Sequence, residues 1–244
     1  MAIQALILVG GLGTRLRPVV GDTPKPMAAV GGRPFLEFLV RQLRRDGFRD
    51  VVLLTGHGAT AVSEYFGTGS AWDLSIAYSR EPGPLGTGGA LRHALPRLSG
   101  PRFLVMNGDS FFDIDLAAVL AAHARATPAP VATLALVRST ETERFGSVEA
   151  DADGTVTAFR EKDESSGPGL VNAGVYVIER SMVEAIPDSR PVSLEREVFT
   201  ELVGRGLHAR EFGGAFVDMG VPDAYAALKA DPSRLLMLLP EAAR

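Results

Sequence analysis

A glycine-rich turn near the start of the chain places two cations beside flexible backbone. The turn spans residues 10–15 (GGLGTR), follows the apolar run 3–9, ends in Arg15, and has Lys25 ten positions behind it. Glycines allow backbone N–H groups to approach phosphate oxygens, and Arg and Lys side chains neutralise phosphate charge. These residue types and their spacing predict a loop that binds a triphosphate and stabilises its charge during reaction.

Two commoner phosphate-binding loops do not match this turn. A Walker loop needs Gly-Lys-Ser/Thr, which does not follow the glycines. The dinucleotide-binding fingerprint takes its first two glycines from Gly11 and Gly13, but Leu16 stands where the third residue must be small. The turn therefore indicates a different class of nucleotide site.

Two aspartates end apolar runs and are candidate metal ligands. Asp109 closes the run 102–107 within Asn107-Gly108-Asp109, and Asp218 closes the run 215–218. An apolar interior cannot solvate a carboxylate, so an acid at such a position favours a ligand or metal site. Two carboxylates together with phosphate oxygens are typical of magnesium, which would polarise the α-phosphate. We therefore predict Mg²⁺ at Asp109 and Asp218.

A second acidic motif offers an alternative metal site. Asp113 and Asp115 form an Asp-x-Asp, the metal motif of many glycosyltransferases. Asp115 directly precedes the helical run 116–120, where an aspartate caps the first free N–H groups. We expect Asp115 to be this cap and assign the metal to Asp109.

Weaker signals suggest the rest of the site. Gly86 and Thr87 lie in a second glycine-rich turn (85–90) that could accept a nucleotide base, or could only begin a helix. Glu161-Lys162 and Asn172 fall on later strands, where a lysine suits a phosphate monoester and the others suit sugar hydroxyls. Glu-Lys pairs are more often surface ion pairs of little consequence.

The first half of the chain alternates strand-like and helix-like segments. This pattern predicts a parallel sheet with helices on both faces, and ligands on such sheets bind at the carboxyl ends of strands. The turn at 10–15 and the acid at 109 both follow strands, so one rim should hold both. We expect strands at 3–9, 50–55, 73–79 and 102–107, and helices at 34–46, 59–66, 86–95 and 115–125.

After residue 130 strand signals dominate. The expected strands are 131–138, 146–150, 155–160, 171–178, 207–212 and 215–218, with helices at 193–204 and 222–229. The predicted fold class is therefore α/β, a Rossmann-like mixed sheet flanked by helices. Residues 1–130 would form a nucleotide-binding lobe, and 131–244 a sugar-phosphate-binding lobe merged with it as one structural domain.

Composition limits the class of protein. The 244 residues carry a net charge of −4 with no basic run, which argues against nucleic acid as a partner. There is no cysteine, so disulfides, thiolate nucleophiles and cysteine-based zinc sites are excluded. No targeting segment or apolar run of about 18 residues is present, so we expect a cytoplasmic protein without a membrane partner. The apolar tail 235–239 could pack on its own chain or form a homodimer.

The whole pattern resembles the sugar-1-phosphate nucleotidyltransferases. Within that family the segments 85–90, 107–115, 193–195 and 217–222 look most like the D-glycero-α-D-manno-heptose 1-phosphate guanylyltransferases, which use GTP. N-acetylmuramate 1-phosphate uridylyltransferases and other hexose 1-phosphate nucleotidyltransferases share much of the pattern. The resemblance implies an NTP and a sugar 1-phosphate as substrates and Mg²⁺ as cofactor.

The resemblance also implies roles for particular residues. Arg15, Lys25 and Asp109 would be catalytic, while Asp109 and Asp218 would bind magnesium. The nucleotide would be bound by Leu8, Gly10, Gly11, Gly13, Thr14, Arg15, Lys25, Gly86, Thr87, Asn107 and Asp109. The sugar phosphate would be bound by Gly146, Glu161, Lys162, Asn172 and Asp218, with Glu195 as a further candidate.

Two other classes remain as alternatives. A metal-dependent glycosyltransferase would rely on Asp113 and Asp115, but its diphosphate leaving group has less need of Arg15 and Lys25. A non-catalytic nucleotide-sugar sensor typically lacks the metal acid or the loop cations, and both are present in this sequence.

Overall fold

A mixed β-sheet runs through the centre of the protein, as the sequence predicted. The computed structural model describes residues 3–140, 142, 147–160 and 167–238. Within these residues nine strands form one sheet, in the order β10-β9-β11-β6-β1-β4-β5, with β8 joined to β11 and β12. The strands are β1 (Gln4–Leu8), β4 (Asp50–Thr55), β5 (Ser75–Arg80), β6 (Arg102–Asn107), β8 (Ala132–Ser139), β9 (Ser147–Ala150), β10 (Val156–Arg160), β11 (Gly169–Glu179) and β12 (Leu207–Glu211).

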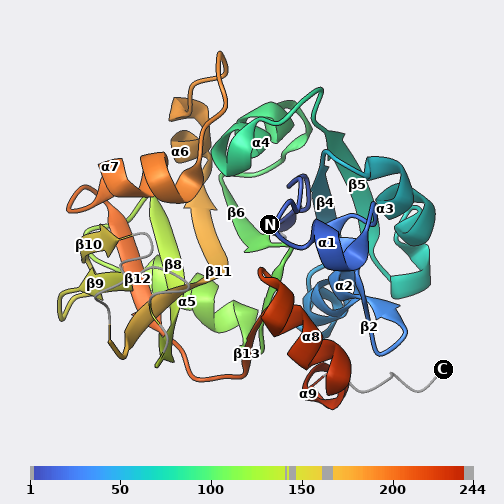
Figure 1. Ribbon diagram of the computed structural model, residues 1–244. Helices are drawn as coiled ribbons and strands as arrows, with labels where there is room; N and C mark the ends of the chain where they lie inside the picture. Colours follow the sequence, from blue (N-terminus) through green and yellow to red (C-terminus); the bar gives the residue numbers. More distant parts are fainter. Residues whose placement is uncertain (1–2, 141, 143–146, 161–166, 239–244) are drawn as a thin grey trace.

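The first four strands of this sheet are parallel. β1 lies between β4 and β6, and β4 pairs with β5, all in parallel register. β11 then pairs antiparallel with β6, and β8 antiparallel with β11, which makes the sheet mixed. Strands from both sides of residue 130 are therefore direct neighbours, with β4 and β5 at one side of the molecule and the β9–β10 hairpin at the other (Figure 1).

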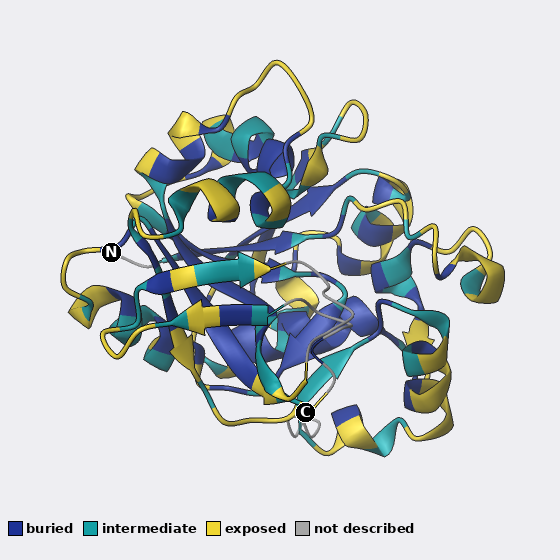
Figure 2. Cartoon of the chain, turned by 60° about the vertical axis from the view of Figure 1, so that its left-hand side comes forward, coloured by how far each residue is buried: buried dark blue, intermediate teal, exposed yellow. Residues whose placement is uncertain are grey.

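Helices cover the sheet on both faces, and alternating side chains supply a core to each. On β1, Ala5 and Ile7 belong to one buried cluster and Leu6 to the other, because successive side chains of a strand point to opposite faces. Buried strands pass through the middle of Figure 2, with helices half exposed around them. The helices are α1 (Arg17–Val20), α2 (Phe35–Arg45), α3 (Ala59–Phe66), α4 (Gly86–Ala94), α5 (Leu116–Arg125), α6 (Arg180–Ala185), α7 (Thr200–Leu202), α8 (Pro222–Ala230) and α9 (Ser233–Leu236).

Shorter elements complete the fold. Two small ribbons pair β2 (Ala29–Val30) with β3 (Arg33–Pro34) and β7 (Ser110–Phe112) with β13 (Phe216–Asp218). Three-residue 3₁₀ turns lie at η1 (Lys25–Met27), η2 (Ser70–Trp72) and η3 (Leu95–Arg97). Among the described residues no helix is long and apolar enough to cross a membrane.

One expected helix has a different form. The segment predicted as a helix at 193–204 begins as a π-helix, η5 (Leu194–Phe199), before α7. The backbone N–H of Val198 donates to the carbonyl of Ser193, five residues back. Ser193 Oγ accepts from the N–H of Arg196, and the N–H of Ser193 donates to the side chain of Glu197. In the capping box of an α-helix the acidic residue stands three positions after the serine, whereas here it stands four positions after it. The wider turn is where Glu195 lies, and π-turns are frequent at functional sites.

Candidate functional site

The glycine-rich turn leaves its backbone donors free. It follows β1, and within the described residues no N–H group from Gly10 to Arg15 has a hydrogen-bond partner. Gly13 adopts φ 60°, and a Cβ there would lie 3.1 Å from Lys25 Cβ, so the turn needs glycine both for its conformation and for its contact with the lysine. A set of unpaired N–H groups on one turn is a binding surface for an anion.

A cavity of about 490 Å³ lies against this turn. Its wall is formed by segments far apart in sequence, which the sheet brings together at the carboxyl ends of β1 and β6 as predicted. The cavity contacts every residue that we expected to bind nucleotide: Leu8, Gly10, Gly11, Gly13, Thr14, Arg15, Lys25, Gly86, Thr87, Asn107 and Asp109. Glu195 also lines it.

Lys25 and Asp109 form an ion pair in the cavity. Lys25 Nζ donates to Asp109 Oδ2 at 2.5 Å, and the lysine side chain is 11% exposed against 39% for the aspartate. Arg15, by contrast, is exposed and has no ion-pair partner within the described part of the chain. The two cations of the motif therefore differ: Lys25 is held in place by a carboxylate, whereas Arg15 is free to contact a ligand.

Asp218 lies beside the loop of Asp109 without lining the cavity. It is opposite Ser110 in the β7–β13 ribbon, and the N–H of Met219 donates to the carbonyl of Asp109 at 3.0 Å. Its Oδ1 accepts from the N–H of Gly220, a residue of the cavity wall.

Thr87 and Glu195 connect α4 to the π-helix. Thr87 Oγ1 donates to Glu195 Oε2 at 2.8 Å and accepts from the N–H of Leu194, also at 2.8 Å. Ser193 Oγ donates to the same carboxylate oxygen at 3.2 Å. Thr87 thus uses its hydroxyl to fix Glu195 at the cavity wall.

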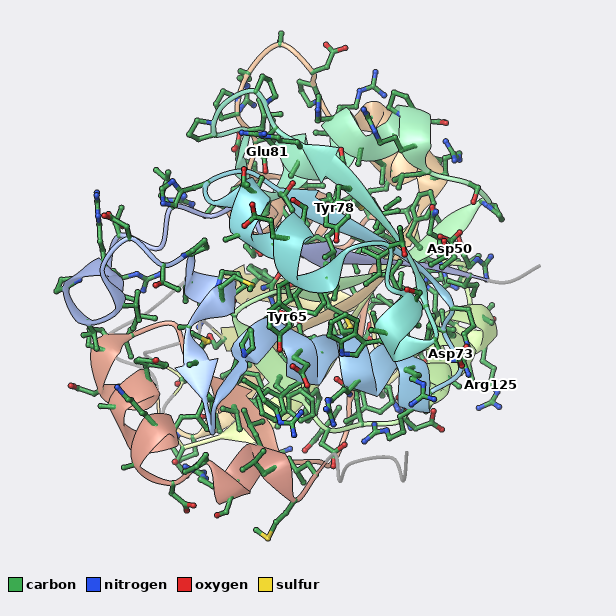
Figure 3. The ribbon with its side chains drawn as sticks, turned by 90° about the vertical axis from the view of Figure 1, so that its right-hand side faces the viewer. Asp50, Tyr65, Asp73, Tyr78, Glu81 and Arg125 are labelled. Carbon is green, nitrogen blue, oxygen red and sulfur yellow. The ribbon has the colours of Figure 1, made fainter. Side chains whose placement is uncertain are left out.

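Glu81 is a cavity residue that no sequence motif singled out. It follows the last residue of β5, as labelled in Figure 3, and its Oε2 accepts from the N–H of Leu85 at 2.9 Å. Burial raises the pKa of its carboxyl. Gly10 allows this approach, because a Cβ there would collide with Glu81 Oε1. The signal was present, since Glu81 is an acid at the end of a strand, like Asp109.

The second acidic motif has structural partners. Asp115 caps α5 by accepting from the N–H of Ala117 at 2.9 Å, as predicted. Asp113 pairs with Arg45 at 2.5 Å. Of the histidines, His57 lies in a small side pocket with Thr14, and His123 is buried against Thr133 and Glu179.

Comparison with known proteins places this geometry in a family. The family model described as nucleotidyl transferase matches residues 4–233. The chain belongs to the nucleotidyl transferase family. As a member it is an enzyme that transfers a nucleotidyl group, and its relatives act on sugar 1-phosphates.

Two relatives and one solved structure show how far the likeness extends. The mannose-1-phosphate guanylyltransferase of Mycobacterium tuberculosis is 40% identical over 94% of this chain, which spans 64% of that protein's length. The D-glycero-alpha-D-manno-heptose 1-phosphate guanylyltransferase of Campylobacter jejuni is 36% identical over 91% of the chain and 97% of its own. The crystal structure of HddC from Yersinia pseudotuberculosis complexed with GMP-PN superposes with a TM-score of 0.80 at 28% identity, covering 93% of this chain and 98% of that one.

For this nucleotidyl transferase, the residues expected to bind sugar phosphate are only partly placed. Gly146, Glu161 and Lys162 lie outside the described residues. Asn172 is on β11, where its side-chain amide donates to the hydroxyl of Tyr176 at 2.9 Å. Family members generally use a divalent metal. Within the described residues no group of three or more acids and histidines could hold one. Magnesium at Asp109 and Asp218 stays a prediction.

Proposed function

We propose that this enzyme joins the nucleoside monophosphate part of GTP to D-glycero-α-D-manno-heptose 1-phosphate, releasing pyrophosphate. The observation that carries the reaction type is the juxtaposition, in one cavity, of unpaired loop N–H groups with exposed Arg15 and the Lys25–Asp109 pair. Donors and cations gathered at one rim suit a triphosphate that gains charge on its departing part.

The reaction needs positioning and charge neutralisation more than covalent chemistry. A phosphate oxygen of the sugar 1-phosphate is already anionic, so it can attack the α-phosphorus in line without a general base. In this proposal Lys25 draws the two phosphates together, and Arg15 stabilises the departing pyrophosphate. A magnesium ion held by Asp109 and Asp218 would polarise the α-phosphate.

Glu81 supports guanine as the base. A carboxylate accepts hydrogen bonds only, and guanine offers two adjacent donors, N1–H and the N2 amino group. Uracil and thymine instead flank their single N–H with two carbonyl oxygens, which a carboxylate repels. The placement of Glu81 in the cavity wall, beside Gly10 and the α4 turn, therefore favours GTP over pyrimidine nucleotides.

The sugar is the finer part of the proposal. The segments 85–90, 107–115, 193–195 and 217–222 look most like those of the heptose guanylyltransferases, and the Campylobacter enzyme is 36% identical over 91% of this chain. We therefore favour the heptose 1-phosphate and keep mannose 1-phosphate as the second candidate, because the mycobacterial enzyme has the higher identity.

A substrate panel tests the proposal. Purified protein is incubated with Mg²⁺, each of five NTPs and a set of sugar 1-phosphates that includes the heptose and mannose, and pyrophosphate release is measured. We expect the highest kcat/KM with GTP and the heptose. Higher turnover with UTP or dTTP contradicts the guanine assignment, and no pyrophosphate from any pair contradicts the reaction.

The pH dependence of the KM for GTP tests whether Glu81 binds guanine. Because burial raises the pKa of Glu81, the KM for GTP should increase as the pH falls toward that raised value. Glu81→Gln should raise this KM about tenfold at neutral pH and abolish its pH dependence, since an amide does not titrate. Glu64→Gln, at an exposed site on α3, serves as the control. A KM for GTP unchanged in Glu81→Gln would remove Glu81 from base recognition.

A further inference from the structure

One buried hydroxyl connects two asparagines that belong to different parts of the site. Tyr176 is fully buried on β11 and does not line the cavity. Its hydroxyl is 2.9 Å from Asn172 Nδ2 and 3.2 Å from Asn107 Nδ2. Asn107 ends β6 on the cavity wall, whereas Asn172 lies on β11 in the sugar-phosphate half. Both asparagines are predicted substrate contacts, whereas the tyrosine between them has no predicted role.

The backbone is shaped for this contact. β11 shifts register against β8 between Asn172 and Tyr176, and a bulge of this kind re-aims side chains that a regular strand would hold apart. Gly174 lies within the bulge at φ 74°, where a Cβ would stand 3.0 Å from Asn107 Cβ. Glycine at this position therefore gives Asn107 the space to reach the hydroxyl.

The donors and acceptors available determine which group donates and which accepts in the hydrogen bonds from Asn172 through Tyr176 to Asn107. Asn172 Oδ1 accepts from the N–H of Gly174 at 3.0 Å, so the Asn172 amide must present its nitrogen to Tyr176. Asn107 Oδ1 is buried without a partner among the described residues, and the hydroxyl proton also needs an acceptor. A half-turn of the Asn107 amide lets Oδ1 accept the hydroxyl proton of Tyr176. Asn172 then donates to Tyr176, and Tyr176 donates to Asn107. The Asn107 amide nitrogen takes the buried position that Oδ1 held, where it has no partner among the described residues.

We propose that Tyr176 is a positioning residue that sets the orientation of both asparagine amides and thereby couples nucleotide binding to sugar-phosphate binding. The inference rests on the proposed function, because it takes Asn107 and Asn172 as substrate contacts. Burial raises the pKa of Tyr176 well above its usual value, so the hydroxyl keeps its proton and acts by hydrogen bonding alone.

The test compares two buried tyrosine hydroxyls. Tyr176→Phe removes the connecting hydroxyl, while Tyr225→Phe removes one that donates to the carbonyl of Ala29 at 3.0 Å, outside the cavity. The KM for GTP, the KM for the sugar 1-phosphate, kcat and the thermal unfolding midpoint are measured for each. We expect Tyr176→Phe to raise both KM values about tenfold and Tyr225→Phe to leave them within about twofold. Equal KM values in the two variants overturn the proposal.

Combined variants separate positioning from a general structural effect. Adding Tyr176→Phe to Asn172→Ala should raise the KM for the sugar 1-phosphate less than about twofold further, because the amide that the hydroxyl orients is already absent. Adding it to Asn107→Ala should behave in the same way for GTP. Effects that multiply independently in both backgrounds overturn the proposal.

A further readout remains if Tyr176→Phe does not fold. Asn172→Ala alone should then raise the KM for GTP as well as for the sugar 1-phosphate, because Tyr176 loses the donor that fixes its direction toward Asn107. A change confined to the sugar 1-phosphate overturns the coupling. Failure of the proposed function is distinguishable, since in that case the unmodified protein itself releases no pyrophosphate.

Discussion

At the scale of single residues, the two cations of the glycine-rich turn are prepared for different tasks. Lys25 is nearly buried and already paired with Asp109, so its position is set before any substrate arrives. Arg15 is exposed at the end of a turn whose N–H groups are unpaired, so its position is set by what it binds. A preorganised cation costs little reorganisation during reaction, whereas a free one can follow the charge on a departing group.

Arg15→Ala should therefore act mainly on turnover. We expect kcat to fall about 10²- to 10³-fold while the KM for the sugar 1-phosphate changes little, because the proposed mechanism assigns Arg15 to the departing pyrophosphate. Arg17→Ala is the matched control, since Arg17 lies two residues away, outside the main cavity, and pairs with Asp22 on the surface. Steady-state pyrophosphate release gives both constants. A larger change in that KM than in kcat would contradict this role.

Asp109→Asn should lower both the rate of pyrophosphate release and the stability of the fold, and the two effects can be measured separately. Loss of the carboxylate should lower pyrophosphate release by at least about 10³-fold, because the proposed magnesium site would lose one of its two charged ligands. The ion pair with Lys25 adds a structural effect that the sequence alone did not indicate, since a nearly buried lysine loses its partner. We expect the free energy of unfolding to fall by about 1–3 kcal/mol in urea titrations. Near-normal turnover in this variant would remove Asp109 from the metal site.

At the scale of elements, a buried carboxylate joins three pieces of the nucleotide-binding half. Glu37 on α2 is 3% exposed. It pairs with Arg33 on β3 at 2.9 Å and with Arg41 one turn along α2 at 2.7 Å. It also accepts from the hydroxyl of Tyr65 on α3 at 2.5 Å. The β2–β3 ribbon, α2 and α3 are therefore fixed to one another by a single side chain.

The charge of Glu37 should make stability depend on acid pH. Burial alone would raise the pKa of Glu37, but hydrogen bonds from Tyr65 and the two arginines outweigh it and lower the pKa. A lowered folded-state pKa gives stability that is complete above the unfolded-state value, about 4.3, and is lost as the pH falls through the lower folded value. Glu37→Gln should cost about 1–3 kcal/mol at neutral pH and flatten this acid limb in urea titrations. Glu64→Gln should retain the limb; a limb unchanged in Glu37→Gln contradicts the assignment.

Elements with a strong local signal could be predicted from the sequence, and elements decided by distant contacts could not. The apolar runs at 50–55 and 102–107 became β4 and β6 at the predicted bounds. The π-turn at Glu195 depends on Thr87, more than a hundred residues away, which accepts from the N–H of Leu194. Glu81 was missed because the strand prediction stopped at residue 79, one short of the end of β5. Tyr176 gave no signal, because its role arises from a bulge that brings two asparagines to one hydroxyl.

At the scale of the whole molecule, the C-terminal segment returns to the first half and contributes Gly220 to the cavity wall. β13 pairs with β7, and α8 lies against β2, below α1 in Figure 1. Tyr225 on α8 donates to the carbonyl of Ala29. The β7–β13 ribbon thus joins the strand that carries Asp218 to the nucleotide-binding half, although this strand comes late in the sequence. The two-lobe division at residue 130 stays a prediction, and the shared sheet makes one cooperative unfolding transition the natural expectation.

Variants in the apolar tail test whether the C-terminal segment packs only within its own chain or also against a second subunit. Leu235 on α9 is fully buried within the chain, whereas Met237 is 72% exposed. Leu235→Ala should lower the free energy of unfolding by about 2–5 kcal/mol, and Met237→Ala should change it by less than about 0.5 kcal/mol. Because the contacts of Leu235 are made within one chain, its cost should not vary with protein concentration across a hundredfold range. A homodimer that used the exposed face of α9 would instead make the unfolding midpoint rise with concentration and make Met237→Ala the more damaging change.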